Sequence, residues 1–348
     1  MAKNGYDGYR GRTRAQSAAR AIVGTLVILL VLAILGLIFA QRYIVYTDDG
    51  IHLDIPFVRE ETAAPPDVAS VSVEVLPRPE TEQTPETRPV PDTVRAVIAG
   101  VDELEADGIS RLTGQGANTV VLDMKGEDGT LGYVSALPLA DGAGARTDRI
   151  SDLIWTLHQA DMHVVARVSC FRDDTLGRRD EYALLTNSGY RWNYDPTGLY
   201  WVNPYHQPVR EYVAGVVGEL AGLGFDEVLL DNCGYPTQGE VGWIRRGDSY
   251  DPSRLDGVVD SFLTLACRAV EGTDTVVSVW ADGAVLDGTD TRSGLTLQQL
   301  NGMDGRVWLR GEDMPALQEL VPQTGLEQRV VWPAADLSER DGHCYLTQ

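Results

Sequence analysis

The stretch F-D-E-V-L-L-D-N-C-G-Y-P at residues 225–236 decides the fold of this chain. Its apolar run 228–230 ends at Asp231, and the N-C-G-Y-P that follows indicates a loop. This pattern is typical of a buried strand that presents a carboxylate at its end, where the reacting groups of a (β/α)8 barrel lie. A strand-end Asp also commonly caps nearby backbone N–H groups, so the stretch by itself leaves both roles open.

Apolar runs of the same kind recur from residue 93 onward. They fall at 94–99, 119–124, 163–169, 227–231, 275–280, 306–309, 329–332 and, more weakly, 344–346, with helical apolar spacing at 148–160, 209–223 and 255–270. Strands that are apolar throughout indicate a parallel sheet covered on both faces. Seven or eight βα units in about 250 residues therefore predict an α/β fold with a closed (β/α)8 TIM-type barrel. No G-x-G-x-x-G follows the first strand, which argues against a dinucleotide-binding fold.

The N-terminal part has the features of a membrane anchor. Residues 1–20 carry five cations against the single Asp7. Residues 21–40 form an uninterrupted apolar run that, at about 1.5 Å per helical residue, crosses a hydrocarbon core of about 30 Å. The run is longer than the roughly 7–15 apolar residues of a cleaved signal peptide, so we expect an uncleaved signal anchor. The basic residues predict a cytoplasmic tail at 1–20 and an extracytoplasmic domain held at the cell membrane.

Residues 41–92 are expected to form an extended stalk below a single barrel domain at 93–348. Within 47–92 there are eight of the prolines, and eleven acidic residues stand against three Arg. Such sequence buries too little apolar surface to offset its conformational entropy. Two short alternating patches, at 51–55 and 71–75, interrupt this composition and are weak candidates for strands.

The composition restricts the possible ligands. Asp and Glu number 51 against 29 Lys and Arg, and the net charge of −22 argues against a nucleic-acid partner and suits neutral or cationic ligands. No cofactor or metal is predicted, because the five His and four Cys contain no C-x-x-C and no H-E-x-x-H. Cys170 and Cys233 both fall at predicted strand ends, and a disulfide between them is possible outside the cytoplasm. The oligomeric state leaves no trace in the sequence.

Polar side chains follow several predicted strands and should meet at one mouth of the barrel. Glycoside hydrolysis requires two carboxylates, one that protonates the leaving oxygen and one that acts as nucleophile or activates water. The candidates for catalysis are Asp123, Glu127, Asp231 and Asp282. The candidates for substrate binding are Lys125, Arg167, Arg172, Trp192, Trp201, Asn203, Asn232 and Trp280. Barrel mouths are polar in any case, and ion pairing of Asp123 with Lys125 or Arg167 would be a purely structural alternative.

An aromatic-rich loop follows the third predicted strand. It contains Y-R-W-N-Y-D at 190–195 and Y-W-V-N-P-Y at 200–205. Aromatic faces stack on the apolar C–H faces of sugar rings, and a barrel loop longer than about 15 residues commonly has a function. Packing of the same rings against the barrel rim is the alternative.

Four segments, taken in order, carry a family resemblance. They are N-T-V-V-L-D-M-K-G-E-D-G (118–129), L-H-Q-A-D-M-H-V-V-A-R-V with F-R-D-D (157–168 and 171–174), R-W-N-Y-D-P-T-G-L-Y-W-V-N-P-Y (191–205) and G-F-D-E-V-L-L-D-N-C-G-Y-P (224–236). Their order and spacing resemble the bacterial putative glycoside hydrolase family, whose barrel is related to the α-amylase clan. The resemblance covers about 93–346. It implies a TIM-type barrel, a carbohydrate ligand and Asp231 as the leading active-site carboxylate.

The chain also departs from this family's pattern at the mouth of the barrel. The fourth-strand motif resembles F-D-Y-V-R-F-P, and its Arg falls on Gly234 here, so a cation beside the site is expected to be missing. The family's W-V-D-P-Y reads W-V-N-P-Y with Asn203, and Asp282 is either the partner acid or displaced from that role. Two functions therefore remain open. One is a membrane-anchored extracytoplasmic glycoside hydrolase acting on envelope or environmental polysaccharide, and the other is an inactive barrel that binds glycan at the cell surface.

Overall fold

The computed structural model describes residues 44–47, 50–53, 91–104, 106–141, 143, 149–310, 314–339 and 342–346. The chain divides into two compact units, residues 1–81 and residues 82–348. The predicted membrane span 21–40 and the alternating patch 71–75 lie outside the described residues. Among the helices of the described ranges, none has both the length and the apolar character needed to cross a bilayer.

The first unit contains a short antiparallel hairpin inside the stretch predicted to be a stalk. Strand β1 (Ile44–Thr47) pairs with β2 (Gly50–Leu53), so that Ile44 lies opposite Leu53 and Thr47 opposite Gly50. The second strand overlaps the alternating patch predicted at 51–55. The predicted stalk therefore contains a short hairpin formed by residues 44–47 and 50–53.

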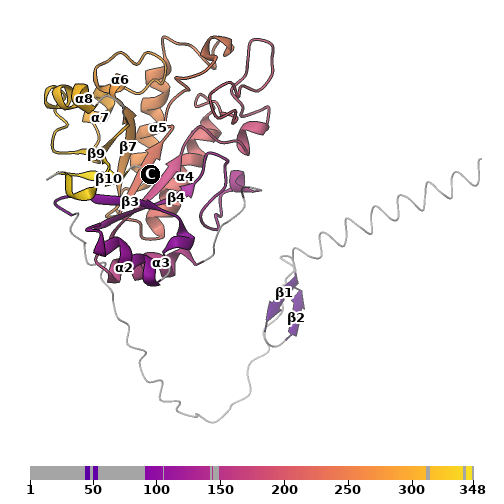
Figure 1. Ribbon diagram of the computed structural model, residues 1–348. Helices are drawn as coiled ribbons and strands as arrows, with labels where there is room; N and C mark the ends of the chain where they lie inside the picture. Colours follow the sequence, from indigo (N-terminus) through magenta and orange to yellow (C-terminus); the bar gives the residue numbers. More distant parts are fainter. Residues whose placement is uncertain are drawn as a thin grey trace, which may run out of the picture. The chain divides into compact units, whose positions relative to one another are not determined.

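The second unit is built around a closed barrel of eight parallel strands, shown in Figure 1. In chain order these are β3 (Arg95–Ala99), β4 (Thr119–Lys125), β5 (His163–Ser169), β6 (Glu227–Asp231), β7 (Val276–Asp282), β8 (Val307–Arg310), β9 (Val330–Ala334) and β10 (Cys344–Leu346). Each strand pairs with the next, and β10 closes the barrel by pairing with β3. The predicted TIM-type barrel is confirmed, including its weak eighth strand.

Helices connect the strands and cover the outside of the barrel (Figure 1). They are α2 (Ala106–Gly114), α3 (Ile150–Gln159), α4 (Gln207–Gly222), α5 (Leu255–Ala269), α6 (Gly283–Leu286), α7 (Leu297–Asn301) and α8 (Met314–Leu320). Short 3-10 turns lie at η1 (Val101–Glu103), η2 (Pro138–Ala140), η3 (Leu176–Arg178), η4 (Val241–Trp243), η5 (Val321–Gln323) and η6 (Leu337–Glu339). The three helices predicted from apolar spacing correspond to α3, α4 and α5.

Alternation along the strands separates two hydrophobic layers. One layer fills the barrel and includes Val121, Val165, Leu229, Trp280 and Trp308, whereas the larger layer lies between the strands and the helices. Successive side chains of a strand point to opposite faces, so the residue two positions after an inward-facing one also faces inward. This alternation carries Asp123, Arg167, Asp231, Asp282 and Arg310 to the inner side of the same barrel mouth.

Candidate active site

Asp231 is the centre of a chain of ion pairs across the mouth of the barrel. Arg167 lies between two carboxylates, with Nη1 3.2 Å from Asp123 Oδ1 and Nε 3.1 Å from Asp231 Oδ2. Arg310, from the end of β8, pairs through Nη2 with Asp231 Oδ1. The same oxygen accepts a 2.6 Å hydrogen bond from the backbone N–H of Asn232. Both carboxylate oxygens are thus occupied, and Asp231 has no exposed surface.

The surroundings of Asp231 keep it ionised. Burial by itself raises the pKa of this carboxyl, but the charges of Arg310 and Arg167, with the hydrogen bonds from Arg310 and Asn232, outweigh it. The pKa of Asp231 therefore lies below its ordinary value. A buried carboxylate that remains negative beside two guanidinium groups can act as a nucleophile, as a base or as an electrostatic anchor.

Asp282 ends the neighbouring strand β7, and its pKa is shifted in the direction opposite to that of Asp231. It is the register partner of Arg310 on β8 and lines a cavity at the mouth. The residue as a whole is exposed, although neighbouring protein atoms desolvate its carboxyl. This partial burial raises the pKa of Asp282; the nearby Arg310 charge opposes the rise, and Asp290 and Asp231 add to it. Two titratable groups whose pKa values are pushed apart are a common arrangement for an acid and its partner base.

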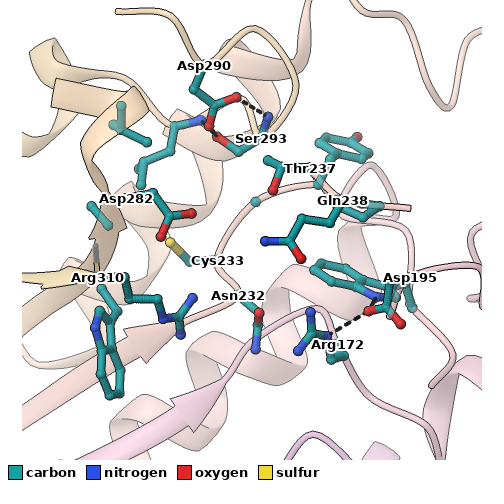
Figure 2. Close-up of a pocket in the computed structure, with 18 residues that line it drawn as sticks. Arg172, Asp195, Asn232, Cys233, Thr237, Gln238, Asp282, Asp290, Ser293 and Arg310 are labelled. Carbon is teal, nitrogen blue, oxygen red and sulfur yellow. Dashed lines mark hydrogen bonds and ion pairs between the residues drawn. The ribbon is translucent and has the colours of Figure 1, made fainter. Parts of the chain in front are cut away.

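The cavity has a volume of about 130 Å³ and lies over the ends of β6, β7 and β8. Figure 2 shows Asp282 and Cys233 on one side of the hollow, Gln238 across from them, and Arg172 with Asp195 at one end. Residues in its wall include Arg172, Asp195, Trp201, Asn232, Cys233, Gln238, Trp280, Asp282, Asp290 and Arg310. The volume is below the roughly 300–1,000 Å³ of typical small-molecule sites. In this conformation the cavity has room for only a small part of a large ligand.

Trp280 forms the floor between the two guanidinium groups that hold Asp231. The Cζ atoms of Arg167 and Arg310 lie 5.2 Å and 4.8 Å from its ring centre. Each distance is within the range in which a cation is attracted to the face of an indole. The ring therefore helps to fix both arginines relative to the carboxylate.

A second polar cluster fixes the aromatic loop to the barrel. Arg172 Nη1 lies 2.8 Å from Glu127 Oε1, and its Nε lies 3.1 Å from Asp195 Oδ2. The guanidinium Cζ is 5.0 Å from the ring centre of Trp201, whose Nε1 donates a 2.9 Å hydrogen bond to Asp195 Oδ2. Arg172 and Trp201 line the cavity, whereas Glu127 lies behind Arg172 and is not part of the cavity wall.

Asn232 turns the chain sharply out of β6. Its backbone is in the left-handed region, with φ of 48°, which Asn adopts more readily than most residues. Its Nδ2 donates to Glu127 Oε1 at 3.3 Å and to Ser169 Oγ at 3.1 Å. Asn232 lines the cavity and also joins the Arg172 cluster to the strand that carries Asp231.

Lys125 does not reach the cavity. Its Nζ lies 2.7 Å from Asp173 Oδ2 and donates a 2.8 Å hydrogen bond to the carbonyl of Ser169, and the residue is 1 % exposed. The register of β4 shifts between Asp123 and Lys125, which breaks the alternation that would have carried Lys125 inward. Lys125 forms a buried ion pair behind the site.

Trp192 and Asn203, both predicted to bind substrate, are buried within the loop structure. Trp192 has no exposed surface, and its Nε1 donates a 3.1 Å hydrogen bond to the carbonyl of Glu240. Asn203 is 3 % exposed, and its Oδ1 accepts a 3.1 Å hydrogen bond from the backbone N–H of Tyr205. Neither lines the cavity. Trp192 packs inside the loop structure and offers no surface to a ligand, in line with the packing alternative stated for the aromatic loop.

Position 234 carries no cation, and a different strand supplies one beside Asp231. A Cβ at Gly234 would lie 2.4 Å from the carbonyl oxygen of Ser293, so no side chain fits there. Arg310 reaches Asp231 from the end of β8. This second source of positive charge was not among the predicted site residues. Arg310 directly follows the predicted strand 306–309, so the strand-end rule that found Asp231 would also have found this residue.

Cys170, Cys233 and Cys267 are free thiols. Cys170 and Cys233 do not form the disulfide considered from the sequence, and both are buried. Burial raises the pKa of the Cys233 thiol to about 12, with a further contribution from the charge of Asp231. Cys233 therefore contributes a neutral thiol to the cavity wall. In the described part of the chain, no group of three or more His, Cys, Asp or Glu side chains is arranged to hold a metal ion.

Comparisons with known proteins bear on the family and the fold of this chain. The model of a family described as "Putative glycosyl hydrolase domain" matches residues 95–305. The glycoside hydrolase domain of PgaB (BpsB) from Bordetella bronchiseptica is 16 % identical, with a TM-score of 0.52 over 74 % of this chain and 94 % of that chain. A hypothetical protein from Ruminiclostridium thermocellum is 23 % identical, with a TM-score of 0.46 over 52 % of this chain and 96 % of that chain. Curated proteins give no match. The PgaB domain supports the fold alone.

Proposed function

Since this chain belongs to the family of putative glycosyl hydrolase domains, we propose that it hydrolyses glycosidic bonds with Asp231 and Asp282 as its carboxylate pair. The observation that carries this proposal is geometric: Asp231 and Asp282 end the adjacent strands β6 and β7, and Asp282 lies in the wall of the mouth cavity. The opposite direction of their pKa shifts supports it. Burial and negative neighbours favour a protonated Asp282, whereas two arginines favour an ionised Asp231. An acid and an ionised carboxylate are the two groups that glycoside hydrolysis requires.

In this mechanism, Asp282 donates its proton to the glycosidic oxygen as the bond to the leaving sugar breaks. In one route Asp231 attacks the anomeric carbon to form a glycosyl ester, and water, deprotonated by Asp282, then cleaves that ester and frees Asp231. In the other route Asp231 removes a proton from the water that attacks the anomeric carbon. Trp280 and Trp201 lie in the cavity wall, but both are nearly buried and arginines cover their rings, so they shape the wall and do not offer an open stacking face. Arg172 and Asn232 supply hydrogen-bond donors at the same wall.

Arg310 controls access to Asp231 in this proposal. Its side chain is 37 % exposed, whereas Asp231 is completely covered. A substrate reaches the carboxylate when the guanidinium moves toward solvent and leaves Oδ1 free. Arg310 lies beside both carboxylates, so its movement also changes the charge that Asp282 experiences.

One observation favours a second function, an inactive barrel that binds glycan. Both oxygens of Asp231 are paired with arginines, and Asp231 is absent from the cavity wall. If Arg310 does not move, Asp231 is a structural anchor and the cavity with Trp201 and Trp280 is a binding site alone. The hydrolase and the inactive glycan-binding barrel would both bind carbohydrate, and only the hydrolase would cleave it.

We further propose that the barrel is held at the outer face of the cell membrane by residues 21–40 and acts on envelope or environmental polysaccharide. The support is the length of the apolar run and the basic residues before it. Protease added to intact cells should digest the barrel and leave residues 1–20 protected. Protection of the whole chain would contradict this location.

The hydrolase proposal is tested by measuring release of reducing sugar from soluble polysaccharides by the full-length protein. The panel contains a neutral α-glucan, a neutral β-glucan and a cationic glucosamine polymer, because the acidic chain suits neutral or cationic ligands. Asp231→Asn and Asp282→Asn should each lower turnover by about 10²-fold or more, whereas Asp152→Asn, which changes an exposed carboxylate on α3, should retain it. Binding without turnover by the unmodified protein would favour the second function. Equal turnover by Asp231→Asn would remove Asp231 from the mechanism.

A further inference from the structure

Two exposed aromatic side chains, Tyr194 and Trp243, form an aromatic rim outside the cavity. Tyr194 is 40 % exposed and Trp243 is 50 % exposed. Their ring centres lie 4.9 Å apart with an angle of 72° between the planes, so the two rings are in edge-to-face contact. The pair therefore presents apolar ring surface to solvent from two segments that are far apart in the sequence.

The backbone on either side holds the aromatic rim in place. The N–H of Glu240 donates to the carbonyl of Tyr194 at 3.1 Å, and the N–H of Asn187 donates to the carbonyl of Trp243 at 2.9 Å. Gly239 has φ of 80°, and a Cβ there would lie 1.9 Å from the carbonyl oxygen of Tyr194. This close approach of the two segments requires glycine. Backbone hydrogen bonds therefore fix the segments that carry both rings, so less conformational entropy is lost when a ligand binds.

The aromatic rim is continuous with the cavity. Asp195, directly after Tyr194, and Gln238, in the segment leading to Trp243, both belong to the cavity wall. The rings also form a row: Trp201 in the wall lies 6.4 Å from Trp192, and Trp192 lies 6.5 Å from Tyr194. Trp192 is fully buried, so the ring surface that this row presents to a ligand next to the cavity is that of Tyr194 with its partner Trp243.

We propose that the aromatic rim binds the part of a polysaccharide chain that extends beyond the cavity, by stacking of sugar rings on Tyr194 and Trp243. This rests on the proposed function of the cavity. A cavity of about 130 Å³ holds a small part of such a polymer, so the remainder must lie outside it. The apolar C–H faces of pyranose rings match exposed aromatic faces, and the chain's net charge of −22 disfavours a nucleic acid in the same place. The rim thus favours long substrates over short ones.

The test compares binding of polymers and short oligosaccharides by the full-length protein. The probes are the three soluble polysaccharides of the turnover panel, and the di- and trisaccharides of whichever polymer binds. Tyr194→Ala and Trp243→Ala should each weaken polymer binding about tenfold, the effect of losing about 1.4 kcal/mol of stacking. Trp243→Phe keeps an aromatic face and should retain most of the affinity. The matched control is Trp155→Ala, which removes an indole that is 61 % exposed on α3.

The outcomes separate this proposal from the one on which it rests. Loss of polymer binding in both rim variants, with unchanged disaccharide binding and an unaffected Trp155→Ala, supports the aromatic rim. Wild-type polymer affinity in both rim variants overturns it, even when Asp282→Asn lowers turnover and the hydrolase proposal stands. Polymer binding that depends on the rim in a protein without turnover on any glycan supports the rim and contradicts hydrolysis. Failure of the unmodified protein to bind any of the polymers overturns the rim. Circular dichroism of each variant checks that the loops remain folded.

Discussion

Strand β6 begins and ends with a buried carboxylate, and the two ends of this one strand differ in what they can do. At the entry, Glu227 accepts from His163 Nε2 at 3.1 Å, Arg306 Nη1 at 2.6 Å and Trp308 Nε1 at 2.9 Å. At the exit, Asp231 is held by Arg167 and Arg310. Glu227 and Asp231 are both fully buried, and each has a pKa below its ordinary value.

The arginines that pair with the two carboxylates differ in their exposure to solvent. The side chain of Arg306 is 9 % exposed, whereas those of Arg167 and Arg310 are 22 % and 37 % exposed. Glu227 is not in the wall of the mouth cavity, and Asp231 lies just behind it beside Asp282, whose pKa is raised. A lowered pKa alone therefore does not identify a functional carboxylate. The distinguishing features at the exit are a partly exposed arginine partner, a second carboxylate whose pKa is shifted in the opposite direction, and an adjoining cavity.

The largest effect is expected beside the exit end of β6, at Asp282 on the neighbouring strand β7. Asp282→Asn should lower kcat by about 10²–10⁴-fold because it removes the general acid. Asp231 must be ionised and Asp282 protonated, so activity should fall at low pH as Asp231 gains a proton and at high pH as Asp282 loses one. The residual activity of Asp282→Asn should lack the fall at high pH. A pH series of kcat/KM on the unmodified and variant enzymes measures this. An unchanged high-pH limb in the variant would exclude Asp282 as the acid.

The next largest effect should be on the entry end, where Glu227→Gln should lower the free energy of unfolding by about 3–5 kcal/mol, because it leaves Arg306 buried without a counter-charge. Burial raises the pKa of Glu227, but His163 and Arg306 outweigh it and bring the pKa to about 2. The depressed pKa gives a contribution to stability that is present above the ordinary Glu value and is lost as pH falls toward 2. Urea denaturation of both proteins at neutral and acidic pH measures the difference.

Asp231→Asn is the matched variant for that experiment. The arginines at the exit reach water more readily than Arg306, so their loss of a partner should cost less stability than Glu227→Gln. A greater loss of stability from Asp231→Asn would show that both ends of β6 are structural.

A smaller effect is expected from Gly234→Ala, in the loop that leaves the exit end. The new Cβ would meet the carbonyl oxygen of Ser293 at 2.4 Å, so the segment around Ser293 must shift. Overpacking of this kind costs about 1–3 kcal/mol. Thermal unfolding measures the loss, and Gly257→Ala on α5, where an added Cβ meets no atom within 4 Å, is the control. Equal stability of the two variants would contradict the close approach at Gly234.

The smallest effect is expected from Asn203→Asp, which restores the carboxylate of the family's pattern. The side chain accepts the N–H of Tyr205 at the entrance to α4, where a carboxylate oxygen can do the same and a negative charge is favoured. Stability should change by less than about 1 kcal/mol, and turnover should stay the same, since Asn203 does not line the cavity. A large gain in turnover would place this position in the active site.

The strand ends that face the barrel interior were predictable from the sequence because alternation is a local rule. Asp123, Arg167, Asp231 and Asp282 each lie at the end of an apolar run, and the ion pairs at the mouth join the first three of them. Lys125 breaks the rule because the register of β4 shifts just before it, and the sequence carries no turn residue that signals the shift. A local irregularity of one residue thus reverses the side on which a strand-end residue lies.

The aromatic loop shows what a single sequence cannot provide. Trp192 and Trp201 are nine residues apart in the same loop, yet one is fully buried and the other lines the cavity. The partner that fixes Trp192 is the carbonyl of Glu240, which belongs to a segment beyond β6. Such a contact forms because the closed barrel brings two loops that are distant in the sequence together. It leaves no periodic pattern in the sequence from which the burial of Trp192 could be predicted. The exposed Trp243 was missed for the same reason.

The contact between Gly234 and Ser293 has a consequence for the way relatives should vary. A long side chain at position 234 and the present path of the segment around Ser293 exclude one another, since no atom fits beyond the Cα. In this chain Arg167 and Arg310 neutralise Asp231, so the carboxylate does not depend on position 234 for a counter-charge. Substitutions at 234 and 293 should change together among homologues, because a larger residue at 234 requires a different path for the segment around 293.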